Sequence, residues 1–87
     1  MTGASVRLRG QLKQLAGQGE LEISAGSVGE LLQALEREVP PLDGWILDER
    51  DRIRRHINVF VNGEYGREDT AVGPDDRVDV LPAISGG

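Results

Sequence analysis

One segment decides the fold of this chain: residues 27–41, which read SVGELLQALEREVPP. Ser27 and Glu30 have the spacing of a capping box, in which each side chain accepts a hydrogen bond from a free backbone N–H at the start of a helix. An apolar stripe at helical spacing follows, made of Val28, Leu31, Leu32, Leu35 and Val39. This stripe predicts a helix of about 12 residues. Pro40-Pro41 end it, because proline cannot donate the next backbone hydrogen bond.

The residues before this helix alternate between apolar and polar, which predicts strands buried on one face. The alternation runs over residues 5–13, from Val6 to Leu12, and resumes over residues 20–23. A turn signal, GQG at residues 17–19, separates the two stretches. The first 24 residues are therefore expected to form a hairpin.

Two further strands are predicted after the helix. Residues 56–61, HINVFV, alternate clearly and lead into Asn62-Gly63, a hairpin signal because both residues tolerate positive φ. A turn at residues 73–76, GPDD, precedes a last strand at residues 77–80, which Pro82 is expected to end.

The segment between the helix and these strands, residues 42–55, is less regular. Its apolar residues Trp45, Ile46 and Leu47 are expected to cover one end of the core. Residues 48–52, DERDR, have mixed charge and predict a solvated loop.

A hairpin, a crossover helix and later strands in one mixed sheet predict an α+β domain with the helix on one sheet face. A right-handed crossover places the last strand beside the first. This arrangement is the β-grasp, or ubiquitin-like, fold. We expect it over residues 1–81, followed by an extended, flexible C-terminal tail over residues 82–87.

Composition limits the function. The chain has 87 residues, no cysteine, one histidine and a formal charge of −5, so thiolate metal sites and cysteine nucleophiles are excluded. The acidic balance argues against nucleic-acid binding, and no apolar run is long enough to span a bilayer. These features predict a small soluble cytoplasmic protein that is not itself an enzyme and holds no metal.

The usual catalytic motifs are absent from the sequence. Asp75-Asp76 lie in a predicted turn, where two hydrated carboxylates form the turn rather than a catalytic pair. His56 stands alone at the start of a strand, and we expect it to be an exposed surface residue.

The last six residues, PAISGG at residues 82–87, differ from the rest of the chain. Extended, they reach roughly 20 Å. Ile84, Ser85 and Gly86 could therefore thread into a partner's active site, and Gly86-Gly87 lack the Cβ that would obstruct a narrow channel. An ionised carboxylate on Gly87 could attack the α-phosphorus of ATP to give an acyl-adenylate. The competing interpretation is a frayed end.

Lys13 is the only lysine beside nine arginines. Arginine stays protonated and does not attack acyl groups, so few side chains would consume an activated terminus. A compositional bias toward arginine explains the same observation.

Phe60 and Leu81 are out of phase with the buried positions of their strands. This predicts that both side chains lie on the open face of the sheet, where clustered hydrophobic residues mark partner sites. The alternative is that residues 42–55 fold over Phe60 and bury it.

Three stretches together resemble the MoaD/ThiS family of ubiquitin-like sulfur carriers: INVFVNGE at residues 57–64, GPDDRVDVL at residues 73–81, and the ending LPAISGG at residues 81–87. The resemblance implies that a ubiquitin-activating-type enzyme adenylates Gly87 with ATP. Gly87 would then carry a thiocarboxylate that a sulfur donor loads and a biosynthetic enzyme accepts, and this chain itself would bind no cofactor.

The resemblance also implies that Phe60, Leu81 and Pro82 face the partners. The ending is similar to those of the cysteine-pathway carrier and of the molybdopterin synthase small subunit. The single Pro82, where the molybdopterin branch commonly has two consecutive prolines, favours the cysteine pathway or another sulfur-containing metabolite. A ubiquitin-like protein modifier and a non-covalent β-grasp adaptor are the remaining alternatives.

Overall fold

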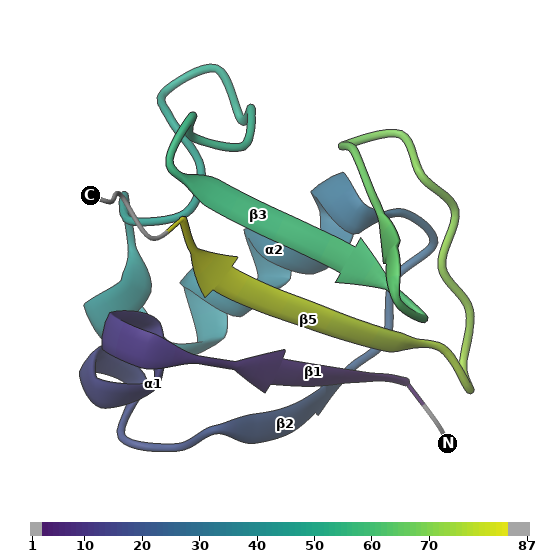
Figure 1. The fold of residues 1–87 in the computed structure, drawn as a ribbon, viewed down its shortest axis with the longest axis horizontal. Coiled ribbons are helices and arrows are strands. Elements are labelled where there is room, and N and C mark those ends of the chain that lie inside the picture. The colour runs from purple at the N-terminus through teal and green to yellow at the C-terminus, as the bar shows by residue number, and fades with distance from the viewer. Residues whose placement is uncertain (1–2, 84–87) are drawn as a thin grey trace.

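The computed structural model describes residues 3–83, which form one sheet with its longest helix across one face and a short helix at the end of the first strand. In chain order the elements are β1 (Ala4–Leu8), α1 (Gly10–Ala16), β2 (Glu20–Ile23), α2 (Val28–Glu38), the 3-10 helix η1 (Pro40–Leu42), β3 (Ile57–Val61), β4 (Glu64–Tyr65) and β5 (Arg77–Pro82). Figure 1 shows the strands in the spatial order β2-β1-β5-β3-β4. β1 and β5 are parallel, and the other neighbours are antiparallel. The last strand therefore lies beside the first, as the sequence predicted for an α+β β-grasp domain.

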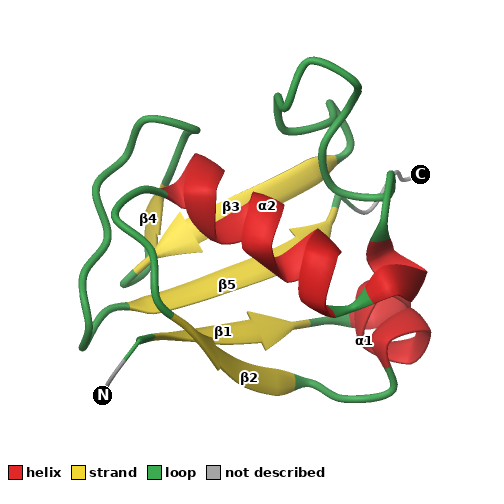
Figure 2. Ribbon diagram, turned by 180° about the vertical axis from the view of Figure 1, so that it is seen from behind, coloured by secondary structure: helices red, strands yellow, loops and turns green. Residues whose placement is uncertain are grey.

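α2 covers one face of this sheet (Figure 2), and its predicted bounds are confirmed to within one residue. The hydroxyl of Ser27 accepts a hydrogen bond from the N–H of Glu30 at 3.3 Å. The Glu30 carboxylate accepts from the N–H of Gly26 at 3.1 Å, one residue earlier than in the predicted capping box. The carbonyls of Glu68 and Thr70 accept from the first two N–H groups of the helix. The N–H groups of Val28, Gly29 and Glu30, the first three of the helix, are thus all hydrogen-bonded.

The prediction of one strand over residues 5–13 was wrong. β1 ends at Leu8, and the short helix α1 follows it. Leu12, which fitted the strand alternation, is buried on the inner side of α1. α1 ends at Gly17, whose φ of 75° is left-handed and whose N–H donates to the carbonyl of Lys13. The hairpin of β1 and β2 is real, but a helix rather than a tight turn connects its strands.

The segment between α2 and β3 contributes to the core as predicted, with one exception. Ile46 and Leu47 are buried, whereas Trp45 is 39% exposed. The Glu36 carboxylate of α2 accepts hydrogen bonds from the N–H groups of Ile46 at 3.0 Å and Leu47 at 2.8 Å. The segment is therefore attached to the helix by its backbone, and Trp45 is left facing outward.

The charged loop at residues 48–52 is exposed, as predicted, but it is also ordered by its own hydrogen bonds. Asp48 Oδ1 accepts from the N–H groups of Arg50 at 2.8 Å and Arg52 at 3.0 Å. These bonds, chiefly the one from Arg52, lower the pKa of Asp48 below its ordinary value.

Both predicted turns are present. Asn62 and Gly63 adopt positive φ, 53° and 88°, and lead from β3 into β4. The Asp76 carboxylate accepts from the side-chain amide of Asn62 at 2.9 Å and from the N–H of Gly73 at 2.8 Å, which lowers its pKa. Asp76 is thus a turn former, as predicted. No helix within residues 3–83 has the length and apolarity needed to cross a membrane.

Candidate tail exit and docking face

The tail leaves the domain from the centre of the sheet. β5 is hydrogen-bonded to β1 on one side and to β3 on the other. Its last residue, Pro82, pairs with Ile57, and the N–H of Ala83 donates to the carbonyl of His56 at 2.6 Å. The chain is therefore held in the sheet as far as Ala83.

The residues proposed for chemistry and threading, Ile84, Ser85, Gly86 and Gly87, lie outside the described residues. Their roles remain predictions. The described part of the chain defines where the tail begins and what surrounds that point.

The junction of β1 and α1 forms the other border of this exit. The N–H of Arg9 donates to the carbonyl of Val80 at 3.2 Å. Gly10 begins α1 with a φ of 59°, and a Cβ on it would lie 3.2 Å from Cγ of Pro82. A residue without a side chain therefore lets the Pro82 ring pack against the backbone of the junction.

The side chains of β3 and β5 separate into two faces as predicted. Val59 and Val80 are buried beneath α2, whereas Phe60 and Leu81 are half-buried on the opposite, open face. Across the strands, Phe60 lies opposite Asp79, and Leu81 lies opposite Asn58.

The alternative for Phe60 was a cover formed by residues 42–55. That segment instead contributes its apolar side chains to the core, namely Leu42, Ile46 and Leu47. Part of the Phe60 ring stays exposed next to the strand that leads into the tail. A docking role for Phe60, Leu81 and Pro82 remains a prediction.

Tyr65 is a candidate that the sequence analysis did not single out. Its ring packs edge-on against Phe60, with 5.8 Å between the centroids, and the residue is 63% exposed. The signal was available, because a two-residue turn at Asn62-Gly63 places Tyr65 opposite Phe60. The two rings form an aromatic pair at one edge of the open face.

Charged residues occupy the other half of the open face. In register, Arg7 lies between Glu20 of β2 and Asp79 of β5. Asp79 also forms an ion pair with Arg77, in which Nε and Oδ2 are 3.7 Å apart. Asp79 Oδ1 is buried and has no hydrogen-bond partner within residues 3–83.

The described body offers little for catalysis. No group of three or more His, Asp or Glu side chains within residues 3–83 is arranged to hold a metal ion. His56 is exposed, and Asp76 is engaged in its turn. Within residues 3–83, the structure thus brings together an open sheet face and the end of β5, from which residues 84–87 continue.

A mixed sheet with one long helix on a single face, and a central last strand that leads into a Gly-Gly ending, defines a ubiquitin-like β-grasp protein. The model of the ThiS family matches residues 6–87. The chain belongs to the ThiS family, whose members are small ubiquitin-like carriers or modifiers and not catalytic enzymes.

Relatives with solved structures agree with this assignment. The chain is 29% identical over 84 residues to small archaeal modifier protein 1 of Haloferax volcanii, covering 93% of this chain and 97% of that protein. The crystal structure of the same protein has a TM-score of 0.87 at 28% identity, covering 97% and 98% of the two chains. The BexX/CysO complex of Amycolatopsis orientalis contains a chain with a TM-score of 0.85 at 26% identity, covering 98% of this chain and 100% of that chain.

A third neighbour is a putative molybdopterin converting factor, subunit 1, from Pyrococcus furiosus. Its superposition on this protein has a TM-score of 0.76 at 25% identity and covers 97% of this chain and 100% of the Pyrococcus chain. The β-grasp fold is thus confirmed, and the similar proteins carry names from several branches of the sulfur-carrier and modifier family.

Proposed function

We propose that this protein is a sulfur carrier whose Gly87 carboxylate is the reacting group. The carboxylate oxygen attacks the α-phosphorus of ATP on an activating enzyme, and pyrophosphate leaves. Hydrosulfide then attacks the acyl carbon and displaces AMP, which leaves a thiocarboxylate on Gly87. With a persulfide donor the same attack gives an acyl disulfide, and a thiol reductant cleaves its S–S bond to release the thiocarboxylate.

One observation carries this proposal: the tail continues from β5, which is held by β1 as far as Val80 and by the β3 side as far as Ala83. A tail anchored in this way starts from a fixed point, so a partner that docks on the body can direct the following residues into its own site. Leu81 offers that partner apolar surface beside the tail exit, and Phe60 and Tyr65 extend the apolar part of the open face farther along β3 and β4.

The sulfur would be delivered to a biosynthetic enzyme in the cytoplasm, for cysteine or another sulfur-containing metabolite. The chain acts there as a protein cosubstrate, with an adenylating enzyme, a sulfur donor and a sulfur acceptor as partners. Belonging to the ThiS family and similarity to a chain of the BexX/CysO complex both support this role. Service as the small subunit of molybdopterin synthase is the alternative within the same chemistry, supported by the Pyrococcus neighbour.

Intact-mass spectrometry tests the proposal. The protein is incubated with ATP, a cognate activating enzyme and a sulfide or persulfide donor. We expect replacement of one oxygen by one sulfur, a gain of about 16 Da by the chemistry of thiocarboxylate formation. The matched control lacks Gly86 and Gly87 and keeps residues 3–83. An unchanged mass of the intact protein, in a reaction where an established carrier is converted by its own enzyme, would refute the role.

Protein modification is a second candidate, favoured by the similarity to small archaeal modifier protein 1. It uses the same adenylated intermediate, which a lysine amine of a target then attacks to form an isopeptide bond. Expression with an N-terminal epitope tag would show a ladder of larger covalent species that disappears when Gly86-Gly87 are deleted. A single band under conditions that produce thiocarboxylate would exclude this candidate.

A further inference from the structure

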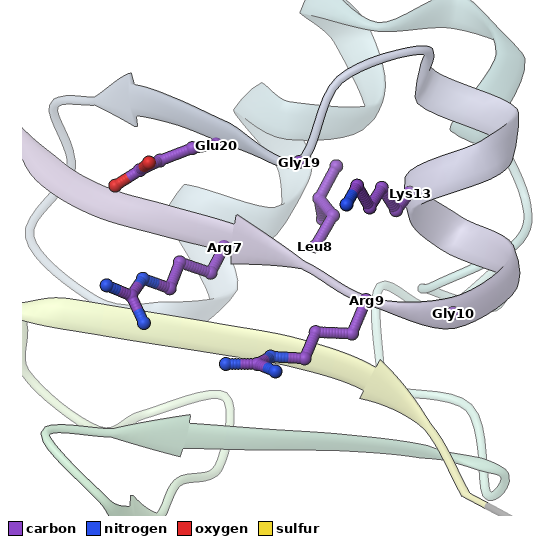
Figure 3. A pocket seen from close by; sticks show the side chains of 7 residues that line it. All are labelled: Arg7, Leu8, Arg9, Gly10, Lys13, Gly19 and Glu20. Atoms are coloured by element: carbon purple, nitrogen blue, oxygen red, sulfur yellow. The ribbon is translucent and has the colours of Figure 1, made fainter.

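A basic depression lies beside the tail exit. Figure 3 shows its lining, which comes from the end of β1, the start of α1 and the beginning of β2. The lining residues are Arg7, Leu8, Arg9, Gly10, Lys13, Gly19 and Glu20, around a volume of about 520 Å³. Three of them are cations and one is an acid, in a chain whose formal charge is −5.

The three cations differ in their acidic neighbours. Arg7 lies in register between Glu20 and Asp79, whose carboxylates partly offset its charge, although within residues 3–83 neither is in ion-pair distance of it. Within residues 3–83, no carboxylate lies in ion-pair distance of Arg9 or Lys13. Both residues are exposed, and their charges are available to an approaching molecule.

The positions of both cations are defined by the backbone around the exit. The N–H of Arg9 is bonded to the carbonyl of Val80, and Figure 3 shows the Arg9 side chain directed over β5. Lys13 lies on α1, one turn after Gly10, and its aliphatic stem runs past Gly19, where an added Cβ would lie 3.0 Å from Cε. The Arg9 charge is thus presented next to the strand that leads into the tail, whereas the Lys13 charge lies on the other side of β1, beside Gly19.

We propose that Arg9 and Lys13 bind carboxylate side chains of the protein that takes up the tail. This inference rests on the proposed function and names the chemistry of the partner surface. The acidic remainder of the chain repels such a surface, whereas the depression attracts it, so the encounter is oriented with the tail toward the partner's site. The depression is exposed rather than enclosing, which suits a protein surface better than a small phosphate ligand.

The test compares two double variants of equal charge. Arg9→Glu with Lys13→Glu reverses both cations of the depression, and Arg37→Glu with Arg67→Glu makes the same charge change at exposed positions on α2 and in the loop after β4. Steady-state adenylation by the activating enzyme is followed at several salt concentrations. We expect the first pair to raise the apparent KM for this protein by roughly tenfold or more at low salt. The control pair should change it by less than about threefold. The difference should shrink as salt screens the charges.

Charge-preserving exchange separates charge from shape. Arg9→Lys with Lys13→Arg should keep the KM within about threefold of the original, because both cations remain. Arg9→Gln with Lys13→Gln should give an intermediate KM, and thermal unfolding of every variant checks that the fold persists.

The proposal is overturned if both reversal pairs raise the KM equally, or if neither does. It is also overturned if the KM for ATP rises instead, because the cations would then act on the nucleotide. These outcomes all require that the original protein is adenylated. If it is not, the proposed function itself fails, and the two results are thereby distinguished.

Discussion

At the scale of single residues, Gly10 is the first residue of α1 and lies against Pro82, the last residue of β5. Its φ of 59° is left-handed, and it leaves room for the ring of Pro82. Gly17, at the other end of α1, has a φ of 75° but nothing within 4 Å of an added Cβ. The two glycines therefore share the same backbone requirement and differ only in the contact with Pro82.

We expect Gly10→Ala to destabilise the protein more than Gly17→Ala. Both substitutions incur the cost of a left-handed alanine, about 1 kcal/mol, and only the first also displaces Pro82. Urea unfolding of both variants measures the difference. Gly10→Ala should also slow thiocarboxylate formation while Gly17→Ala does not. Equal losses of stability and activity in the two variants would show that the contact between Gly10 and Pro82 has no importance.

At the scale of elements, Glu36 holds the segment between α2 and β3 in place. Its carboxylate accepts from the N–H groups of Ile46 and Leu47, and both of these residues are buried. We expect Glu36→Ala to lower the free energy of unfolding by about 2 kcal/mol, because two buried donors lose a charged acceptor.

Glu38→Ala is the matched control, since Glu38 is an exposed acid near the end of the same helix. It should change the free energy of unfolding by less than about 0.5 kcal/mol, as surface substitutions usually do. Chemical denaturation of both variants at neutral pH gives the comparison. A loss in Glu38→Ala as large as that in Glu36→Ala would point to helix propensity instead of the two hydrogen bonds.

The elements also show why the sequence predicted part of the fold and missed α1. The apolar stripe of α2 and the alternation of β3 each fit one period only, so both were predicted correctly. Leu12 fits a strand that includes Val6 and Leu8, yet it equally begins the helical spacing continued by Leu15 and Ala16. The positive φ of Gly10 decides between them, and the conformation of a glycine cannot be read from its identity.

The candidate site was predictable in a similar, partial way. The local alternation of apolar residues predicted that Phe60 and Leu81 lie on the open face. The two-residue turn after β3 also predicts that Tyr65 lies opposite Phe60, a step that the sequence analysis did not take. Arg9 escaped notice because its position next to β5 depends on where β1 ends and on the register of β1 against β5, neither of which was predicted. Such a contact joins distant parts of the chain, and charges brought together by a crossover leave no local pattern.

At the scale of the whole molecule, three carboxylates connect stability to pH. Hydrogen bonds lower the pKa of Glu68, chiefly from the N–H of Ile53, and of Asp48, chiefly from the N–H of Arg52. The pKa of Asp76 is lowered chiefly by the side chain of Asn62. In the native state these groups bind fewer protons than in the unfolded chain at mildly acidic pH, so unfolding takes up protons there.

The free energy of unfolding should therefore be constant at neutral pH and fall once the pH drops below the ordinary values, 4.5 for Glu and 3.8 for Asp. Urea unfolding between pH 7 and pH 3 measures this profile. Glu68→Gln should be less stable than the original at pH 7, and its stability should fall less steeply with acid. A parallel decline in both proteins would remove Glu68 from the explanation.

A change outside the folded body tests whether that body only delivers the tail. We expect the addition of one tryptophan after Gly87 to leave the thermal unfolding midpoint unchanged, because residues 3–83 form the sheet and core without it. Thiocarboxylate formation should be abolished, since the new terminus is bulky and the Gly87 carboxylate is lost in a peptide bond. Adding tryptophan to the N-terminus is the control, and intact mass confirms that neither protein is trimmed. Full conversion of the C-terminally extended protein would contradict the assigned role of Gly87.

The central position of β5 also determines how the protein responds to force. A partner that draws the tail inward pulls along this strand, which is joined to β1 on one side and to β3 on the other. The load then acts in shear on both rows of bonds at once, rather than peeling an edge strand open bond by bond. If the proposed function holds, the domain should therefore resist traction at its carboxyl end, so that withdrawal of the tail from a partner leaves the fold intact.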